Sequence, residues 1–201
     1  MIQVGALTLL AMLAASEILS AKPDGHERKR EVDAIIVHSL GGPDCEGGKQ
    51  IFHEITGDAR YWVQRFRTLP LVSIHYVVGR DGDVQTGIPE ERAASHAVGW
   101  NQRSIGIELV NNADGKDPFP QVQIDALVAL VQAIRLRHPA IADDRILRHS
   151  DVDHSMFPAA KFGVGCTQYR RKLDPGEAFP WAAFKAAVGA RGLTPSVLPG
   201  V

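Results

Sequence analysis

The stretch Ala34-Ile35-Ile36-Val37-His38 decides how this chain is expected to fold. Consecutive apolar residues, most of them β-branched, are typical of a strand that is buried on both faces of a sheet. Gly41-Gly42-Pro43 breaks the chain shortly afterwards. We therefore expect a central strand that ends at His38, where the side chain can reach a cleft beside the sheet.

Further strand and helix patterns surround this run. The clearest is residues 121–137, where apolar side chains recur with the helical period. Asp58 is a suitable N-cap for another helix, which Pro70 ends. The other expected elements are strands at 73–78, 84–88, 104–110 and 145–148, and a last helix after Asp174-Pro175-Gly176. This mixture predicts a mixed α/β fold, with a central mixed β-sheet flanked by helices.

Composition excludes several classes of protein. The chain has 201 residues, a formal charge of −1, 45% hydrophobic and 22% charged residues, as in an ordinary globular protein. The balanced charge gives no reason to expect nucleic acid as a partner. Two cysteines exclude a disulfide-built scaffold and a four-cysteine zinc site.

The N-terminal segment is expected to be separate from the domain. The apolar run 6–15 is too short to cross a membrane and suits the apolar region of a secretory signal. An N-terminal helix of a cytosolic protein is the alternative. We expect a signal segment and a solvated polar linker over 1–31, the domain over 32–188, and a loose tail over 189–201.

Residues that can bind a metal stand at the predicted strand ends. His38 and His149 each end a strand, and Lys172 and Asp174 lie two apart, so their side chains share one face of an extended segment. Two histidines and a carboxylate form a zinc site with a free fourth position. Glu108, in an otherwise apolar strand, indicates a general base or a paired core residue. Because a lone histidine is more often structural, a zinc hydrolase is only one hypothesis at this point.

Six segments occur in an order that is typical of a known family. They are residues 36–39 (IVHS), 73–82 (SIHYVVGRDG), 94–97 (ASHA), 104–109 (SIGIEL), 148–151 (RHSD) and 172–181 (KLDPGEAFPW). Together they resemble the zinc-dependent N-acetylmuramoyl-L-alanine amidases of the amidase-2 type. That family shares its fold with T7-type lysozymes and peptidoglycan recognition proteins. The resemblance covers about residues 32–186.

The resemblance implies a role for each candidate residue. His38, His149 and Asp174 match the family's zinc ligands, for one zinc ion per chain. Glu108 matches the glutamate that acts as general base on the zinc-activated water, and Lys172 matches the lysine that stabilises the oxyanion. The implied reaction cuts the amide between N-acetylmuramic acid and L-alanine of the stem peptide. Asp174, where T7-type lysozymes usually have Cys, resembles the bacterial amidases that act on cell-wall fragments.

Other polar residues near these segments have two interpretations. His96, in a turn that lines the substrate groove in the family, contacts substrate or has a structural role. Trp100 and Asn101 follow it and are predicted to bind substrate, with a solvated loop as the alternative. His75 lies within a strand and is expected to be a hydrogen-bonded core histidine.

The segment between His149 and Lys172 is longer than the compact form associated with the family. This insert, residues 153–170, contains His154 and Cys166. We expect His154 to lie at the surface rather than to bind the metal. Cys166 forms a disulfide with Cys45 in an exported protein, or both are unrelated small hydrophobic residues.

Alternatives to the zinc amidase remain at this stage. One is a noncatalytic peptidoglycan-binding module of the same fold, although such a module is expected to lack a ligand or Glu108. Another is a phage-type endolysin. The expected partner is peptidoglycan or a muropeptide, with no nucleic acid and no membrane span in the mature protein. The expected location is the periplasm or cell envelope, or else the cytoplasm, and the sequence leaves the oligomeric state open.

Overall fold

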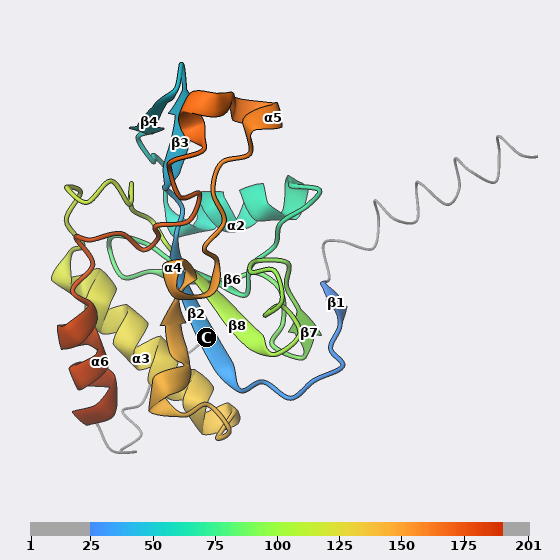
Figure 1. Cartoon of the computed structure of the whole chain (residues 1–201). Helices are drawn as coiled ribbons and strands as arrows, with labels where there is room; N and C mark the ends of the chain where they lie inside the picture. Colours follow the sequence, from blue (N-terminus) through green and yellow to red (C-terminus); the bar gives the residue numbers. More distant parts are fainter. Residues whose placement is uncertain (1–24, 191–201) are drawn as a thin grey trace, which may run out of the picture.

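A computed structural model describes residues 25–190 and is centred on a five-stranded sheet (Figure 1). Its strands, in spatial order, are β6 (Val84–Thr86), β5 (Tyr76–Val78), β8 (Ser104–Leu109), β2 (Ala34–Ser39) and β9 (Ile146–Arg148). The hairpin β5–β6 is antiparallel, and the other neighbours are parallel. The predicted mixed sheet is confirmed, with the apolar run 34–38 in a central strand. The candidate signal 6–15 lies outside the described residues.

Helices cover both faces of the sheet, which makes three layers (Figure 1). Helices α3 (Gln121–Arg137) and α6 (Trp181–Ala190) pack on one face through a large apolar core that includes Ile35, Ile107 and Phe184. Helix α2 (Ala59–Thr68) packs on the other face over a smaller core. Asp58 accepts a hydrogen bond from the Tyr61 backbone N–H, so the predicted N-cap of α2 is confirmed.

The segment before β2 departs from the expected solvated linker. Residues His26–Glu27 form β1, which pairs antiparallel with β7 (Arg92–Ala93). The guanidinium of Arg28 donates hydrogen bonds to the carbonyl oxygens of Glu90 and Gln102. Residues 26–28 are therefore tied to the domain by β1 and by the half-buried Arg28, although the side chains of His26 and Glu27 are exposed as expected of a solvated segment.

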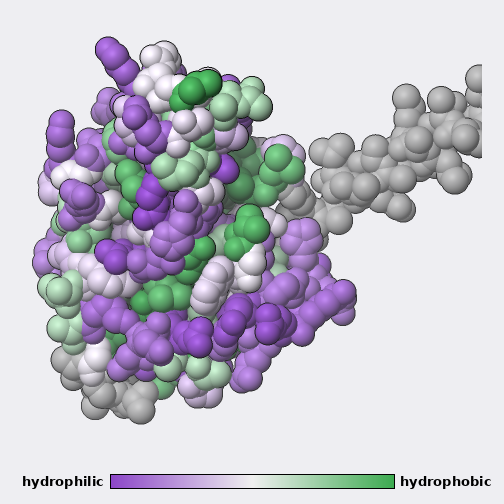
Figure 2. All heavy atoms as spheres, viewed as in Figure 1, coloured by the Kyte–Doolittle hydropathy of each residue, from purple (hydrophilic) through white to green (hydrophobic). Residues whose placement is uncertain are grey.

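A second departure is a small unit built from two chain segments. The hairpin of β3 (Pro43–Glu46) and β4 (Lys49–Phe52) packs against the insert, which contains α5 (Ala159–Phe162) and the 3-10 turn η2 (Val164–Cys166). Cys45 and Cys166 form a disulfide with their Cα atoms 6.0 Å apart. The sequence left this pairing open. This unit stands at the upper end of the molecule in Figure 1, where Figure 2 shows hydrophobic residues among hydrophilic ones.

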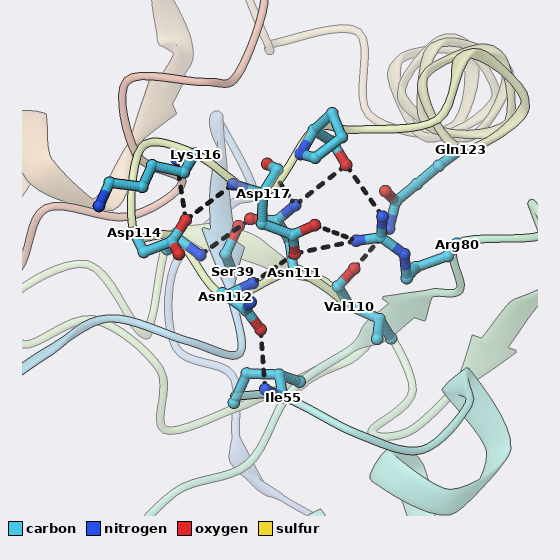
Figure 3. Close-up of polar contacts among 12 residues, drawn as sticks. Ser39, Ile55, Arg80, Val110, Asn111, Asn112, Asp114, Lys116, Asp117 and Gln123 are labelled. Carbon is cyan, nitrogen blue, oxygen red and sulfur yellow. Dashed lines mark hydrogen bonds and ion pairs between the residues drawn. The ribbon is translucent and has the colours of Figure 1, made fainter. Parts of the chain in front are cut away.

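The loop that follows β8 is held by a dense set of hydrogen bonds (Figure 3). Asp117 accepts two hydrogen bonds from Arg80 and one from the backbone N–H of Asn112. The side-chain oxygen of Asn112 accepts from the Ile55 backbone N–H. A Cβ atom at Gly41 would collide with the Asn112 carbonyl, which explains the glycine after β2. These contacts fix the loops at the carboxyl ends of β2 and β8.

Short elements complete the chain: the 3-10 turn η1 (Asp143–Arg145) before β9, and α4 (His149–Val152) directly after it. Within residues 25–190 no helix is long and apolar enough to cross a membrane.

Candidate active site

A cleft of about 390 Å³ opens at the carboxyl ends of the central parallel strands. β2 brings His38 to it and β8 brings Glu108, because these two residues are paired across the strands. His149 begins α4, directly after β9. The segment before α6 supplies Asp174 and Lys172. Residues that are far apart in sequence thus meet at one edge of the sheet, as their positions predicted.

Three predicted ligand atoms converge in this cleft. The Nδ1 atoms of His38 and His149 lie 2.9 Å apart. Oδ2 of Asp174 lies 2.9 Å from Nδ1 of His149 and 3.3 Å from Nδ1 of His38. All three residues are buried. The backbone around Asp174 is fixed, since its carbonyl accepts a hydrogen bond from the Ser150 backbone N–H.

This triangle of donor atoms fits a tetrahedral zinc ion. Zinc binds nitrogen and oxygen at about 2.0–2.2 Å, so two ligands of a tetrahedron lie about 3.3–3.6 Å apart. The observed separations, 2.9–3.3 Å, lie at or a few tenths of an ångström below this range. The two facing Nδ1 atoms of His38 and His149 cannot both carry a proton at 2.9 Å. These three atoms are therefore better arranged to bind a cation than to form hydrogen bonds with one another.

Electrostatics favour the forms of these side chains that bind metals. Burial lowers the pKa of His38 to about 4, against the raising effect of Asp174. Burial raises the pKa of Asp174, but the contacts with the His149 and His38 rings outweigh it and hold that pKa well below its usual range. A neutral imidazole and an ionised carboxylate are the ligand forms.

Glu108 lies beside the ligands in the wall of the cleft and is partly buried. Its Oε2 atom is buried and has no hydrogen-bond partner within residues 25–190. Burial and the charge of Asp174 raise the pKa of Glu108 to about 8, while Lys172 lowers it. A buried carboxyl oxygen without a partner is costly unless the site uses it. A carboxyl with a pKa close to neutral can accept and return a proton.

The predicted substrate residues lie in different places. His96 lines the cleft, but Trp100 and Asn101 do not. The side-chain oxygen of Asn101 accepts hydrogen bonds from the backbone N–H groups of His96 and Ala97, so it closes the turn that carries His96. Their predicted contacts with substrate stay predictions.

His75 and His154 lie where the sequence placed them. His75 is buried, and its Nδ1 accepts a hydrogen bond from the Gly106 backbone N–H, which confirms a core histidine. His154 is exposed and lies outside the ligand cluster.

Part of the cleft wall was missed in the sequence. Asp44 of β3 and His53, just after β4, line the cleft, and Nε2 of His53 lies 3.5 Å from Oδ2 of Asp44. The signal that could have found them is Gly47-Gly48, a dipeptide typical of two-residue hairpin turns. Trp62 and Phe66 of α2 also line the cleft.

Comparison with known families gives a match over most of the chain. Residues 28–177 match the family described as N-acetylmuramoyl-L-alanine amidase. This range includes every predicted ligand, Glu108 and Lys172. It is also close to the range over which the sequence segments resemble that family.

Individual relatives show the same likeness. The 1,6-anhydro-N-acetylmuramyl-L-alanine amidase AmpD of Enterobacter cloacae is 32% identical over 190 residues, covering 87% of this chain and 90% of its own. The endolysin of Escherichia phage T7 is 33% identical over 93 residues, covering 46% of this chain and 57% of its own. The structure of the amidase AmiD from E. coli, in complex with anhydro-N-acetylmuramic acid-L-Ala-D-gamma-Glu-L-Lys, superposes with a TM-score of 0.55 at 23% identity. It matches over 80% of this chain and 59% of AmiD, and this likeness shows the fold alone.

Proposed function

The chain belongs to the N-acetylmuramoyl-L-alanine amidase family, and from this premise we propose how its own residues cut the bond between muramic acid and L-alanine. The observation that carries the proposal is the convergence of three ligand atoms within 4.8 Å of one another, beside Glu108 and in one cleft. A noncatalytic module is not expected to retain this complete set.

His38, His149 and Asp174 would hold a single zinc ion. Bound there, zinc would supply a Lewis acid for the amide carbonyl and for a water molecule. Three protein ligands leave a fourth position open toward the cleft, which is the arrangement of catalytic rather than structural zinc sites. The residues fit this role because their ligand forms are favoured by burial and by their mutual contacts.

Glu108 acts as the general base in this proposal. It takes a proton from the attacking water while the water oxygen adds to the lactyl carbonyl. It then returns the proton to the nitrogen of L-alanine as the C–N bond breaks, which leaves a free amine and a carboxylic acid that loses its proton to solvent. The Oε2 atom of Glu108 supports this role, because no group in residues 25–190 forms a hydrogen bond with it and it is free to accept a proton.

Lys172 stabilises the developing negative charge. Its ammonium lies close enough to affect the pKa values of both Glu108 and His38. A fixed cation beside the reacting carbonyl favours the transition state over the neutral amide. Lys172 lines the cleft next to the ligand segment, which supports its position near the oxyanion.

We propose released 1,6-anhydromuropeptides as the substrate class. The AmpD relative is named for this substrate and matches 87% of this chain and 90% of its own. The cleft of about 390 Å³ has room for a fragment of sugar and peptide.

The test uses purified protein with soluble anhydromuropeptides and with intact sacculi, each with and without a chelator. The account expects faster release of stem peptide from the fragments, loss of activity with chelator and recovery with zinc. Faster cleavage of sacculi would contradict the fragment substrate. Failure of the zinc-loaded protein on both substrates would contradict the amidase mechanism.

The compartment is a separate proposal. We propose the cell envelope, because the Cys45–Cys166 disulfide persists in oxidising compartments and is rare in the cytoplasm. Alkylation of the protein in intact cells, followed by mass spectrometry, tests this. No free thiol supports the envelope, and two free thiols support the cytoplasm instead.

A further inference from the structure

We propose that His96 is a positioning residue that fixes the tautomer of the metal ligand His38, and that Ser104 orients His96. The inference rests on the metal site of the proposed function and concerns groups behind it. His38 points Nδ1 toward the other ligands, while its second nitrogen, Nε2, lies 2.9 Å from Nδ1 of His96. Which of the two nitrogens carries the proton decides whether His38 can bind a metal.

The direction of each hydrogen bond in this chain of groups follows from the backbone carbonyl of Trp100, which can only accept a hydrogen bond. The hydroxyl of Ser104, a fully buried residue, lies 2.8 Å from the carbonyl oxygen of Trp100 and donates to it. The Ser104 hydroxyl therefore has no second proton to donate to His96. Nε2 of His96 lies 3.2 Å from the Ser104 oxygen, so this nitrogen must carry a proton and donate it to the hydroxyl oxygen.

The tautomer of the His96 ring determines which nitrogen of His38 carries a proton. No carboxylate within residues 25–190 contacts the His96 ring, so the ring is neutral and has a single N–H, at Nε2. Its Nδ1 is then an acceptor and receives the proton of His38 Nε2. His38 therefore keeps its Nδ1 lone pair free, at the corner of the ligand triangle.

The backbone around His96 holds the ring in place. A Cβ atom at Gly106 would lie 2.6 Å from Cγ and from Nδ1 of His96, so only glycine in β8 lets the ring lie against the strand. Asn101 fixes the other side of the residue through the backbone N–H of His96. These contacts explain why His96 has one orientation, and they give the glycine of the segment 104–109 a physical reason.

His75 is a natural comparison, because its ring centroid lies 5.6 Å from that of His96 but no hydrogen bond joins them. His75 accepts from the Gly106 N–H at Nδ1 and lies 3.0 Å from the Arg92 carbonyl at Nε2. The guanidinium of Arg28 also lies 3.1 Å from Nε2 of His75, so the partners of this ring are two backbone groups and Arg28, and none of them is Ser104 or His38. His75 is therefore buried near His96 but does not hydrogen-bond to Ser104, His96 or His38.

Partners of this kind usually matter for metal affinity. A histidine ligand generally donates its second ring nitrogen to a fixed acceptor, and loss of that acceptor costs about 10–100-fold in metal affinity or activity. Here the acceptor is another imidazole, which can itself donate or accept. Ser104 is needed because without an oriented hydroxyl the His96 ring could present N–H to His38 and place the His38 proton on Nδ1.

The experiment measures zinc affinity by chelator competition in three full-length variants. His96→Leu removes the acceptor and is expected to weaken zinc binding by about 10–100-fold. His96→Asn keeps an acceptor oxygen near the position of Nδ1 and should recover most of the affinity. His75→Leu is the matched control, which removes a neighbouring buried histidine and should lower the melting temperature while leaving zinc affinity close to that of the wild type.

The second readout is the tautomer itself, from ¹⁵N spectra of the histidine rings in zinc-free protein. His38 should be protonated at Nε2 alone in the wild type and in the His75→Leu variant, and should become a mixture in His96→Leu. Unchanged zinc affinity and an unchanged His38 tautomer in His96→Leu would overturn the proposal, as would a wild-type His38 protonated at Nδ1. Because the spectra need no zinc, a wild-type protein that binds none would contradict the proposed function without deciding this inference.

Discussion

Two glutamates of this protein differ in their hydrogen-bond partners and in the direction in which their pKa values are shifted. Glu108, in the cleft, has an oxygen without a partner, and burial raises its pKa to about 8. Glu90, away from the cleft, accepts hydrogen bonds from Arg137 and from the hydroxyl of Tyr76, and lies 2.8 Å from Nε2 of His138. Burial opposes its ionised form too, but these partners lower its pKa to about 2.

Under the proposed mechanism, Glu90 contributes to the stability of the fold, whereas Glu108 contributes to the reaction. Glu90 is saturated with donors and stabilises the contact between β5, α3 and the loop that carries it. Glu108 is left unsatisfied at a cost to stability, and such a cost is retained where a proton must move. The following predictions test this division, beginning with the largest expected effect.

Replacement of each glutamate by glutamine should separate activity from structure. Glu108→Gln keeps the shape of the side chain but cannot accept a proton, so turnover should fall about 10²–10⁴-fold. The variant should retain its zinc. Glu90→Gln is the matched control and should keep turnover near the wild-type value in folded protein. Near-normal turnover of Glu108→Gln would assign the base to another residue.

The cleft region also depends on a covalent link that the Glu90 region lacks. Replacing both Cys45 and Cys166 by alanine frees the hairpin β3–β4 from the insert, which the disulfide joins across 121 positions. Typical losses for a native disulfide are about 2–4 kcal/mol in the free energy of unfolding. Denaturant unfolding of the oxidised wild type and the double variant measures the difference. An equal midpoint in both proteins would mean that the bridge does not contribute.

The free energy of unfolding should fall more in Glu90→Gln than in Glu108→Gln, which is the reverse of the order expected for activity. Glu90→Gln removes the charge that faces Arg137 and is expected to cost about 1–3 kcal/mol. Glu108→Gln removes only a carboxyl without a partner at Oε2, so the free energy of unfolding should be unchanged or higher. Thermal and urea unfolding of zinc-free proteins give both values. A larger loss for Glu108→Gln would contradict the division.

The smallest effect is a pH dependence that belongs to Glu90. Its folded pKa of about 2 lies below the usual value of 4.5, so the stabilisation is complete above pH 4.5 and is lost as the pH falls toward 2. The groups that face it are Tyr76, Arg137, His138 and, at longer range, Arg28. Unfolding free energies between pH 5 and 2.5 should fall more steeply in wild type than in Glu90→Gln. Parallel curves would refute the assignment.

Much of the fold was predictable because its signals are local. The helix 121–137 has the predicted bounds, and the apolar run before His38 forms the predicted central strand. The strand expected at 73–78 begins only at Tyr76, since the Gly106 N–H bonds to the His75 ring rather than to a neighbouring backbone carbonyl. Short polar strands such as β3 and β4 carry no periodic signal and were missed.

The ligands were predictable from strand ends together with the resemblance to the amidases. The role of His96 was not, because its ring partners are 8 and 58 positions away and their order depends on which atoms donate. Spacing in the sequence says nothing about that order. The disulfide was undecided for a similar reason, as two cysteines alone do not determine a distance.

Metal content tests the central claim most directly. Protein purified without added metal, dialysed and analysed by mass spectrometry, should contain about one zinc per chain in the wild type and in Glu108→Gln. His38→Ala, His149→Ala and Asp174→Ala should each contain none and be inactive, while remaining folded by circular dichroism. Fully active wild-type protein that contains no zinc would contradict the account.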